Sequence, residues 1–225
     1  MRDNTAGKSI DYMILLFIIT FLTCLFAILA IRAREQQLRI QFYFFKPLTM
    51  FIILWMATVV AQPKYSHYFW FIMGGLIFCL AGDILLMLPA DRFIAGLISF
   101  LAGHIFYIWA FTSGKGFTFS LEIVFPFVLL EILIYGILVR RLNKMKLPVF
   151  IYTTVIVIMA WQSWERWNVM GSIVTLLAAI GAVLFLISDG LLAINRFRKE
   201  YPYAHVLILS TYYTAQCLIA LSVHQ

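Results

Sequence analysis

Residues 67–88 read HYFWFIMGGLIFCLAGDILLML, a nearly unbroken apolar run that contains one acidic residue, Asp83. About 20 apolar residues wound as an α-helix cross the hydrocarbon core of a bilayer. The length and composition of this run therefore predict a transmembrane helix. The same run also predicts a carboxyl group within the membrane.

The rest of the chain repeats this pattern over 225 residues. Hydrophobic residues make up 64% of the sequence and charged residues only 12%, about half the charged fraction of an ordinary globular protein. We therefore predict an all-α, polytopic integral membrane protein with about eight spans, forming a single transmembrane domain over residues 1–225. The spans are expected at residues 11–31, 43–62, 67–88, 92–112, 119–140, 147–164, 168–192 and 203–223.

The net charge of +7 arises from basic clusters between the apolar runs. Such residues set topology and contact anionic lipid head groups, so membrane lipids and not nucleic acid are the expected partners. Most of them fall in the odd-numbered loops: Arg32, Arg34, Arg39, Lys46, Arg92, Arg140, Arg141, Lys144, Lys146, Arg196, Arg198 and Lys199. The opposite side holds Arg2, Lys8, Lys64, Lys115 and Arg166.

This asymmetry predicts the orientation of the protein. By the positive-inside rule the odd loops face the cytoplasm and both termini face away from it. The first apolar run is followed, not preceded, by basic residues, which indicates an anchor and not a cleaved signal. The short loops favour a bacterial inner membrane.

A faint internal repeat links the third and seventh spans. Residues 82–86 read GDILL and are followed by Arg92-Phe93, whereas residues 188–192 read SDGLL and are followed by Arg196-Phe197. Four spans separate the two copies, so a duplication would give two parallel halves. Chance similarity is the alternative, because Leu-Leu is common in such a composition.

The repeat predicts two carboxyl groups at matching depth. Asp83 lies five residues before the end of its span, roughly 7–8 Å deep at the rise of an α-helix, and Asp189 lies on the same side. Two carboxyls in one apolar cavity cannot both ionise, so one can donate a proton while the other accepts one. The pair is therefore a candidate for general acid–base chemistry.

Local pairing is the alternative for these carboxyls. An ionised Asp in hydrocarbon is costly, at about 2.5–3.5 kcal/mol or more, and needs a partner. Salt bridges from Asp83 to Arg92 and from Asp189 to Arg196 would satisfy both groups near the membrane surface.

The fourth span has a face of small and polar residues, which allows close helix packing. Its members are Gly96, Ser99, Phe100, Gly103, His104 and Tyr107. His104 and Tyr107 share a helix face, and Tyr212 and Gln216 in the last span add a hydroxyl and an amide. His104 is either a hydrogen-bonded structural group or part of a site.

Other polar residues have simpler interpretations. Glu131 lies in mid-span and is a candidate for a proton pathway, with no partner evident. Three tryptophans beside Glu165 and Arg166 fit an interfacial aromatic belt; they are Trp161, Trp164 and Trp167.

Neither a metal centre nor a disulfide is expected. The other histidines are expected near the outer surface, near the inner surface and at the C-terminus, so they cannot converge on His104 to form a three-histidine zinc site. They are His67, His205 and His224. The cysteines are expected to be small core residues; they are Cys24, Cys79 and Cys217.

The ordered set of motifs resembles the YhhN-type lysoplasmalogenase family, which includes animal lysoplasmalogenases. The specificity lies in the order of the pieces from about residue 46 to 220. The pieces are Lys46-Pro47, Gly82-Asp83 with Leu85-Leu86, Arg92-Phe93, Gly96, Phe100, Gly103-His104, Tyr107, Ser188-Asp189 with Leu192-Ala193, Asn195-Arg196-Phe197, Tyr212-Tyr213, Gln216 and Leu218-Ile219.

The resemblance implies an eight-helix hydrolase of ether lipids that requires no cofactor. Its substrate would be a lysophospholipid with a vinyl ether bond, cleaved to a fatty aldehyde and glycerophosphocholine or glycerophosphoethanolamine. The catalytic residues would be Asp83 and Asp189. The phosphate-binding residues would be Lys46, Arg92 and Arg196. The residues that orient water or the glycerol hydroxyl would be His104, Tyr107, Tyr212 and Gln216.

Two other functions use the same carboxyl pair. A proton-coupled transporter or lipid carrier would employ it as a relay, and a parallel half-repeat suits that class. An intramembrane aspartyl protease is the weaker alternative, because the loops are short and protease signatures are absent.

Overall fold

The computed structural model describes residues 3–61, 66–89 and 92–224, with side chains described from residue 11. Arg2 and Lys64 therefore lie outside the described residues, as does the side chain of Lys8. The helices are α1 (Asp3–Glu35), α2 (Arg39–Val60), α3 (His67–Met87), α4 (Phe93–Thr112), α5 (Leu121–Leu138), α6 (Lys146–Met170), α7 (Ile173–Phe197) and α8 (Ala204–Leu221), with a 3₁₀ turn η1 (Asn143–Met145).

All eight α-helices are long and apolar enough to cross a membrane. Helices satisfy their own backbone hydrogen bonds, which is what a spanning segment requires in lipid. The prediction of an all-α integral membrane protein with eight spans is confirmed. The internal repeat stays a prediction.

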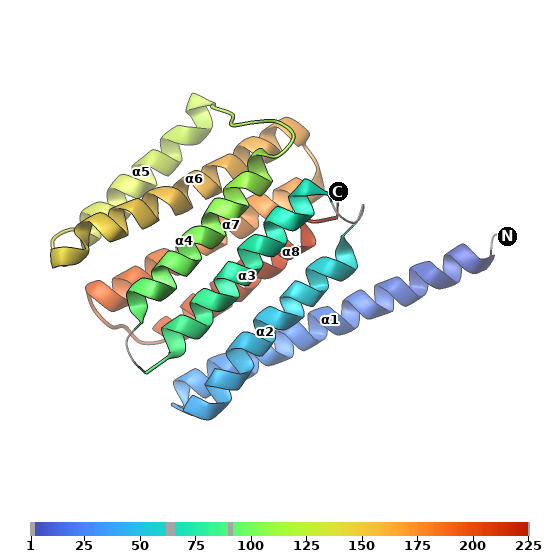
Figure 1. Ribbon diagram of the computed structural model, residues 1–225, viewed down its shortest axis with the longest axis horizontal. Helices are drawn as coiled ribbons and strands as arrows, with labels where there is room; N and C mark the ends of the chain where they lie inside the picture. The colour runs from blue at the N-terminus through green and yellow to red at the C-terminus, as the bar shows by residue number, and fades with distance from the viewer. Residues whose placement is uncertain (1–2, 62–65, 90–91, 225) are drawn as a thin grey trace.

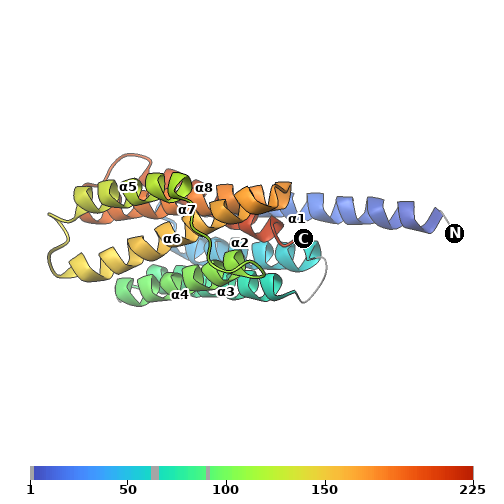
Figure 2. The ribbon, with the colours of Figure 1, turned by 90° about the horizontal axis from the view of Figure 1, so that it is seen from above.

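The helices form a bundle whose core lies between α2, α3, α4, α6, α7 and α8 (Figure 1). Helices α3 and α4 pack as one pair and α7 and α8 as another. Seen from above, α3 and α4 lie on one side of the bundle and α5 and α7 on the other, while the N-terminal part of α1 projects beyond the rest (Figure 2). This arrangement brings the ends of α3 and α7 to the same end of the bundle.

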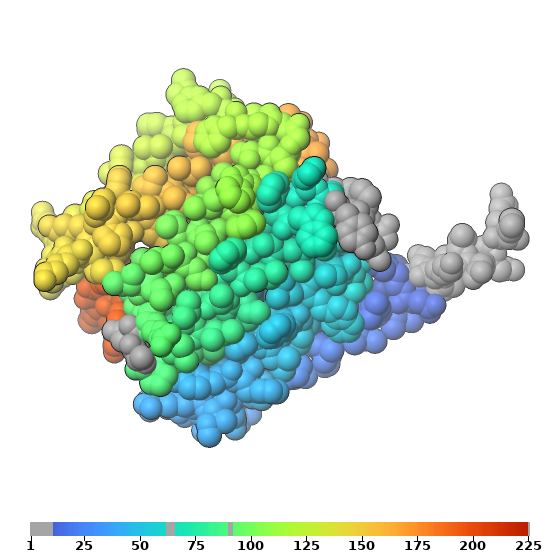
Figure 3. All heavy atoms as spheres, viewed as in Figure 1, coloured from blue at the N-terminus to red at the C-terminus, as the bar shows by residue number. Residues whose placement is uncertain are grey.

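The outer surface is apolar. Figure 3 shows α2, α3, α4 and α6 side by side on one face. Large exposed hydrophobic side chains of these helices include Phe51, Trp55, Trp70, Ile77, Ile98 and Trp109. Cys24 is also exposed, so the expectation that it is a core residue is wrong, whereas Cys79 is buried. Such a surface suits lipid as the surrounding solvent.

Glycines allow α3 and α4 to approach closely. A Cβ added to Gly103 would lie 3.1 Å from the backbone oxygen of Gly75. The Ser99 hydroxyl donates a hydrogen bond to the Phe78 carbonyl across the same contact, at 2.7 Å. The prediction that small residues of the fourth span serve close packing is confirmed.

Replacing Gly75 with alanine is expected to lower the free energy of unfolding by about 1–3 kcal/mol, as overpacking does in other cores. The new Cβ would lie 2.2 Å from Cε1 of Tyr107, a side chain with no exposed surface. Thermal unfolding in detergent measures the effect. Gly136→Ala is the control, because nothing lies within 4 Å of its added Cβ; equal melting temperatures for the two variants would contradict the prediction.

Several helix boundaries differ from the predicted spans, and helix α1 extends over Asp3–Glu35 where 11–31 was expected. Helix α2 begins at Arg39, which places Pro47 inside the helix and not in its first turn. Helix α7 continues to Phe197, past the expected end at 192. Helix α6 continues to Met170 and ends at Gly171, which has a positive φ of 63°. That left-handed conformation suits glycine and stops the helix.

The polar group near the end of α6 is buried, and this corrects the assignment of Trp161 to an aromatic belt. Glu165 accepts hydrogen bonds from the backbone N–H and hydroxyl of Ser120, at 2.6 and 2.9 Å, and from Nε1 of Trp161, at 3.0 Å. Trp161 is itself buried against Phe117 and Phe119. The Glu165 carboxylate, whose charge suggested that the helix ends before it, instead binds the α4–α5 connection to α6.

Candidate active site

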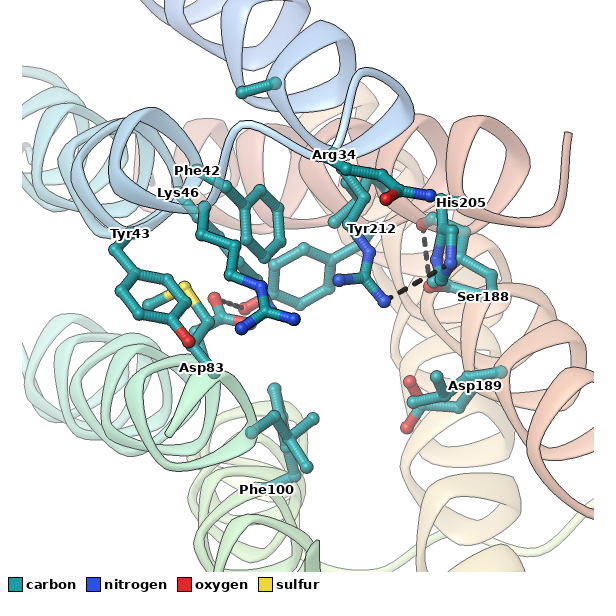
Figure 4. A pocket seen from close by; sticks show the side chains of 18 residues that line it. Arg34, Phe42, Tyr43, Lys46, Asp83, Phe100, Ser188, Asp189, His205 and Tyr212 are labelled. Atoms are coloured by element: carbon teal, nitrogen blue, oxygen red, sulfur yellow. Dashed lines mark hydrogen bonds and ion pairs between the residues drawn. The ribbon is translucent and has the colours of Figure 1, made fainter. Parts of the chain in front are cut away.

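A cavity of about 220 Å³ lies at the end of the bundle where α1, α3 and α7 end and α2 and α8 begin. Asp83 of α3 and Asp189 of α7 both line it, on facing sides (Figure 4). Phe100 of α4 lies between them along the wall. The two carboxyls predicted from the sequence thus share one cavity.

Asp83 is held by two partners. Its Oδ1 lies 2.9 Å from Nζ of Lys46 on α2. The Tyr212 hydroxyl on α8 donates a hydrogen bond to its Oδ2 at 2.7 Å. Asp83 and Lys46 are only 2% and 7% exposed, so each charge depends on the other in a region where water is scarce. The expectation that Arg92 pairs with Asp83 is therefore wrong, because the cation that pairs with Asp83 is Lys46.

Asp189 has a different environment. The Tyr152 hydroxyl on α6 donates a hydrogen bond to its Oδ2. No lysine or arginine among the described residues forms a recorded ion pair with Asp189, and the expected partner Arg196 instead lies over the Phe93 ring, 5.1 Å from its centroid. Next to it, the Ser188 hydroxyl donates to the Ile208 carbonyl at 3.0 Å and ties α7 to α8. The carboxyls therefore differ: Asp83 faces an ammonium group and Asp189 a neutral phenol.

An apolar groove adjoins the cavity at Asp189. Its volume is about 40 Å³, and residues of α4, α5, α6 and α7 line it, including Phe93, Ile134, Ile156 and Ala193. The residues that line both spaces are Leu86, Phe100, Asp189 and Leu192. Asp189 therefore stands where a polar space meets an apolar one, whereas Asp83 lines only the polar space.

Three of the predicted orienting residues do not line the cavity. His104 is fully buried beneath Tyr152, and its ring centroid lies 4.7 Å from that of Phe185. Neither of its ring nitrogens has a hydrogen-bond partner within the described part of the chain. Tyr107 donates to Oε1 of Gln216 at 2.7 Å, also with no exposed surface. This placement supports a structural link between α4 and α8 more than contact with a substrate.

Of the three predicted phosphate-binding residues, only Lys46 lines the cavity. Arg92 lies at the N-terminus of α4 and is exposed, and Arg196 is also exposed. The basic residues that join Lys46 in the lining are Arg34, Arg39 and His205.

Sequence reasoning missed Tyr152, Arg34 and His205. Tyr152 lies in a predicted span. A tyrosine hydroxyl within a membrane needs a hydrogen-bond partner, and this need was the signal that could have identified Tyr152 as part of a polar site. Arg34 and His205 looked like ordinary interfacial residues, because 171 positions separate them in the chain. Only the packing of α1 against α8 brings them together.

Glu131 has hydrogen-bond partners on the neighbouring helix α6. Its Oε1 accepts hydrogen bonds from the hydroxyls of Thr153 and Thr154, at 2.7 and 3.2 Å. It is not among the residues that line the cavity. These bonds join α5 to α6.

A bundle of eight helices long and apolar enough to span a membrane, with two carboxyls in a cavity at one end, defines a polytopic membrane protein with a polar site at one end of its spans. Comparison with known proteins identifies the family of this protein. The chain belongs to the YhhN family, whose family model matches residues 41–223.

Named relatives fall into two groups. The human protein called lysoplasmalogenase TMEM86B is 34% identical over 157 residues, covering 67% of this chain and 62% of its own length. The pig protein of the same name is 33% identical and covers 77% of this chain and 71% of its own. An uncharacterized membrane protein YhhN of Escherichia coli is 25% identical and covers 89% and 96%. No solved structure matches the chain.

Proposed function

We propose that this protein is a lysoplasmalogenase, a membrane hydrolase that cleaves the vinyl ether bond of a lysophospholipid. The observation that carries the proposal is the pairing of Asp83 and Asp189 in one cavity that continues into an apolar groove. The similarity to relatives named lysoplasmalogenase supports the same activity. Acid–base catalysis of this hydrolysis needs one proton donor and one acceptor, as glycoside hydrolysis does.

The environments of the two carboxyls suggest their roles. An ammonium group at 2.9 Å favours the ionised form of Asp83, which suits a base that activates water. Asp189 borders the apolar groove and has no ion-pair partner among the described residues, and apolar surroundings without a cation favour its protonated form, which suits the acid. The double bond of an alkenyl chain would begin at this groove.

The reaction balances with these two groups and one water molecule. Asp189 donates its proton to the β-carbon of the vinyl ether, which leaves an oxocarbenium ion and an Asp189 carboxylate. Water adds to the α-carbon and loses a proton to Asp83, giving a hemiacetal. The hemiacetal hydroxyl then returns a proton to Asp189, and Asp83 protonates the leaving glycerol oxygen. A fatty aldehyde and a glycerophosphodiester are released, and both carboxyls regain their starting states.

The alkenyl chain lies in the apolar groove in this proposal. The groove is lined mostly by apolar side chains, with Asp189, Tyr152 and Thr153 as its polar residues, and its walls come mainly from α4, α5, α6 and α7. Helix α5 has a single buried residue, Leu138, so it packs loosely enough at the lipid-facing edge to let a chain enter from the side. Burial of each methylene group there contributes about 0.8 kcal/mol.

Substitution of Gly190 tests the groove. Gly190 lines it, and an added Cβ would meet only Cδ1 of Ile134, at 3.9 Å. Gly190→Leu is therefore expected to fold but to fill the groove, lowering aldehyde release from long-chain substrates by roughly tenfold or more. The control Gly136→Leu points into open space and should retain activity. Equal loss in both variants would remove the groove from the proposal.

The activity itself is tested with protein purified in detergent. Wild type supplied with an alkenyl-glycerophosphocholine is expected to release a fatty aldehyde, and the saturated alkyl analogue should release none, because protonation requires the double bond. Absence of aldehyde from the alkenyl lipid would refute the proposal. Proton-coupled uptake into proteoliposomes without hydrolysis would favour a transporter instead.

We also propose that the cavity opens toward the cytoplasm of a bacterial cell, with both termini outside it. The end of the bundle that holds the cavity carries most of the basic residues, including Arg34, Arg39 and Arg196, and basic loops are retained in the cytoplasm. A reporter enzyme fused to the C-terminus is expected to lie in the periplasm. A C-terminal reporter that lies in the cytoplasm would show that the orientation is the opposite one.

A further inference from the structure

A second polar cluster lies at the mouth of the cavity, apart from the two carboxyls. Arg34, at the end of α1, places Nη2 3.3 Å from Nε2 of His205 at the start of α8. Its guanidinium carbon lies 5.5 Å from the centroid of the Phe42 ring. Figure 4 shows Arg34 and His205 joined on the opposite side of the cavity from Asp83. Two neighbouring helices thus hold the guanidinium over the opening.

This guanidinium has donors to spare. Arginine carries five N–H donors in a planar fork, and among the described residues the Arg34 side chain forms a hydrogen bond with His205 alone. Among the described residues, no carboxylate lies within ion-pair distance of Arg34. Lys46, deeper in the cavity, is already paired with Asp83. The unused positive charge of the cavity therefore lies at its mouth, on Arg34 and the neighbouring Arg39.

We propose that Arg34 and His205 bind the phosphate of the lysophospholipid headgroup. This inference rests on the proposed function and assigns the headgroup to residues other than Arg92 and Arg196. Three glycerol carbons join the vinyl ether oxygen to the phosphate ester, so the phosphate must bind in the same cavity as the carboxyls. Arginine forms paired, charge-assisted hydrogen bonds with phosphate oxygens. In this proposal the phosphate binds at the mouth of the cavity, the glycerol lies inside the cavity, and the alkenyl chain lies in the apolar groove.

The test measures binding without catalysis. A saturated alkyl-glycerophosphocholine, which has no double bond to hydrolyse, is titrated into the detergent-purified full chain, and the matching alkylglycerol without phosphate is titrated in parallel. Arg34→Gln is expected to weaken binding of the phospholipid about tenfold or more, as loss of a hydrogen bond to a charged group does. Binding of the alkylglycerol should be unchanged. His205→Ala should act in the same direction.

The matched control is Arg32→Gln, two residues earlier in α1, on a different face of the helix and outside the cavity lining. If Arg34→Gln and Arg32→Gln weaken phospholipid binding equally, or if the alkylglycerol is affected as much as the phospholipid, the assignment fails. Inorganic phosphate that binds as tightly as the phospholipid would also overturn it, since the site would then hold a free anion. Arg34-dependent binding in a protein that never releases aldehyde would instead refute the hydrolase and leave this site standing.

Discussion

Asp189→Asn is expected to lower aldehyde release by about 10²–10⁴-fold, the usual contribution of a positioned general acid. Asparagine keeps the shape of the side chain and can still accept the hydrogen bond from Tyr152, but it cannot deliver a proton to carbon. The fold should therefore remain, and binding of the saturated alkyl-glycerophosphocholine should stay within about twofold. Two quantities are measured: kcat for the alkenyl substrate and Kd for the saturated alkyl analogue.

Glu131→Gln is the matched control for this change. It also removes a carboxyl within a span, but Glu131 does not line the cavity and bonds to threonines of α6. Its activity should remain near that of wild type. An Asp189→Asn variant that retains most of its kcat, or a Glu131→Gln variant that loses as much, would remove Asp189 from the acid's role.

Lys46→Met is expected to reduce both stability and activity strongly. It leaves the Asp83 carboxylate buried without the ammonium group that lies 2.9 Å from it, and breaking a buried ion pair from one side costs about 3–5 kcal/mol. The carboxyl can escape this cost by taking up a proton, which would abolish its action as a base. Thermal unfolding in detergent and aldehyde release measure the two effects.

The double variant Lys46→Met with Asp83→Asn separates these effects. Replacing both partners removes the unpaired charge, so most of the lost stability should return, whereas activity should not. Lys144→Met serves as the control, because that side chain is exposed and lies outside the cavity. If Lys46→Met unfolds at the same temperature as Lys144→Met, the pair with Asp83 is not a stabilising feature of the protein.

Hydropathy predicted the spans well because each span depends on its own residues. A run such as 67–88 needs lipid around it wherever its neighbours lie, and α3 extends over almost the same residues. The boundary of α6 was misjudged for the opposite reason. Glu165 looked like a charge that must leave the membrane, but Ser120, from a distant part of the chain, satisfies it.

The candidate site was predictable only in part. Asp83 and Asp189 stood out because a carboxyl in an apolar run is costly wherever it faces. Their partners could not be identified in the same way. Tyr212 and Asp83 are separated by 129 positions, and which face of α8 turns toward α3 depends on packing that a nearly uniform apolar helix does not reveal in its sequence. His104 and Tyr107 shared a helix face as expected, but that face lies below the cavity.

The sequence by itself determined that this chain lives in a membrane, how many times it can cross, and that two carboxyls must find a polar environment there, because transfer from water to lipid is a property of each segment alone. Tertiary structure decided that Lys46 neutralises one carboxyl, that Tyr152 contacts the other, and that Arg34 meets His205 at the cavity mouth. These contacts depend on the rotation and tilt of packed helices, which short-range interactions between side chains fix only when the whole bundle is assembled.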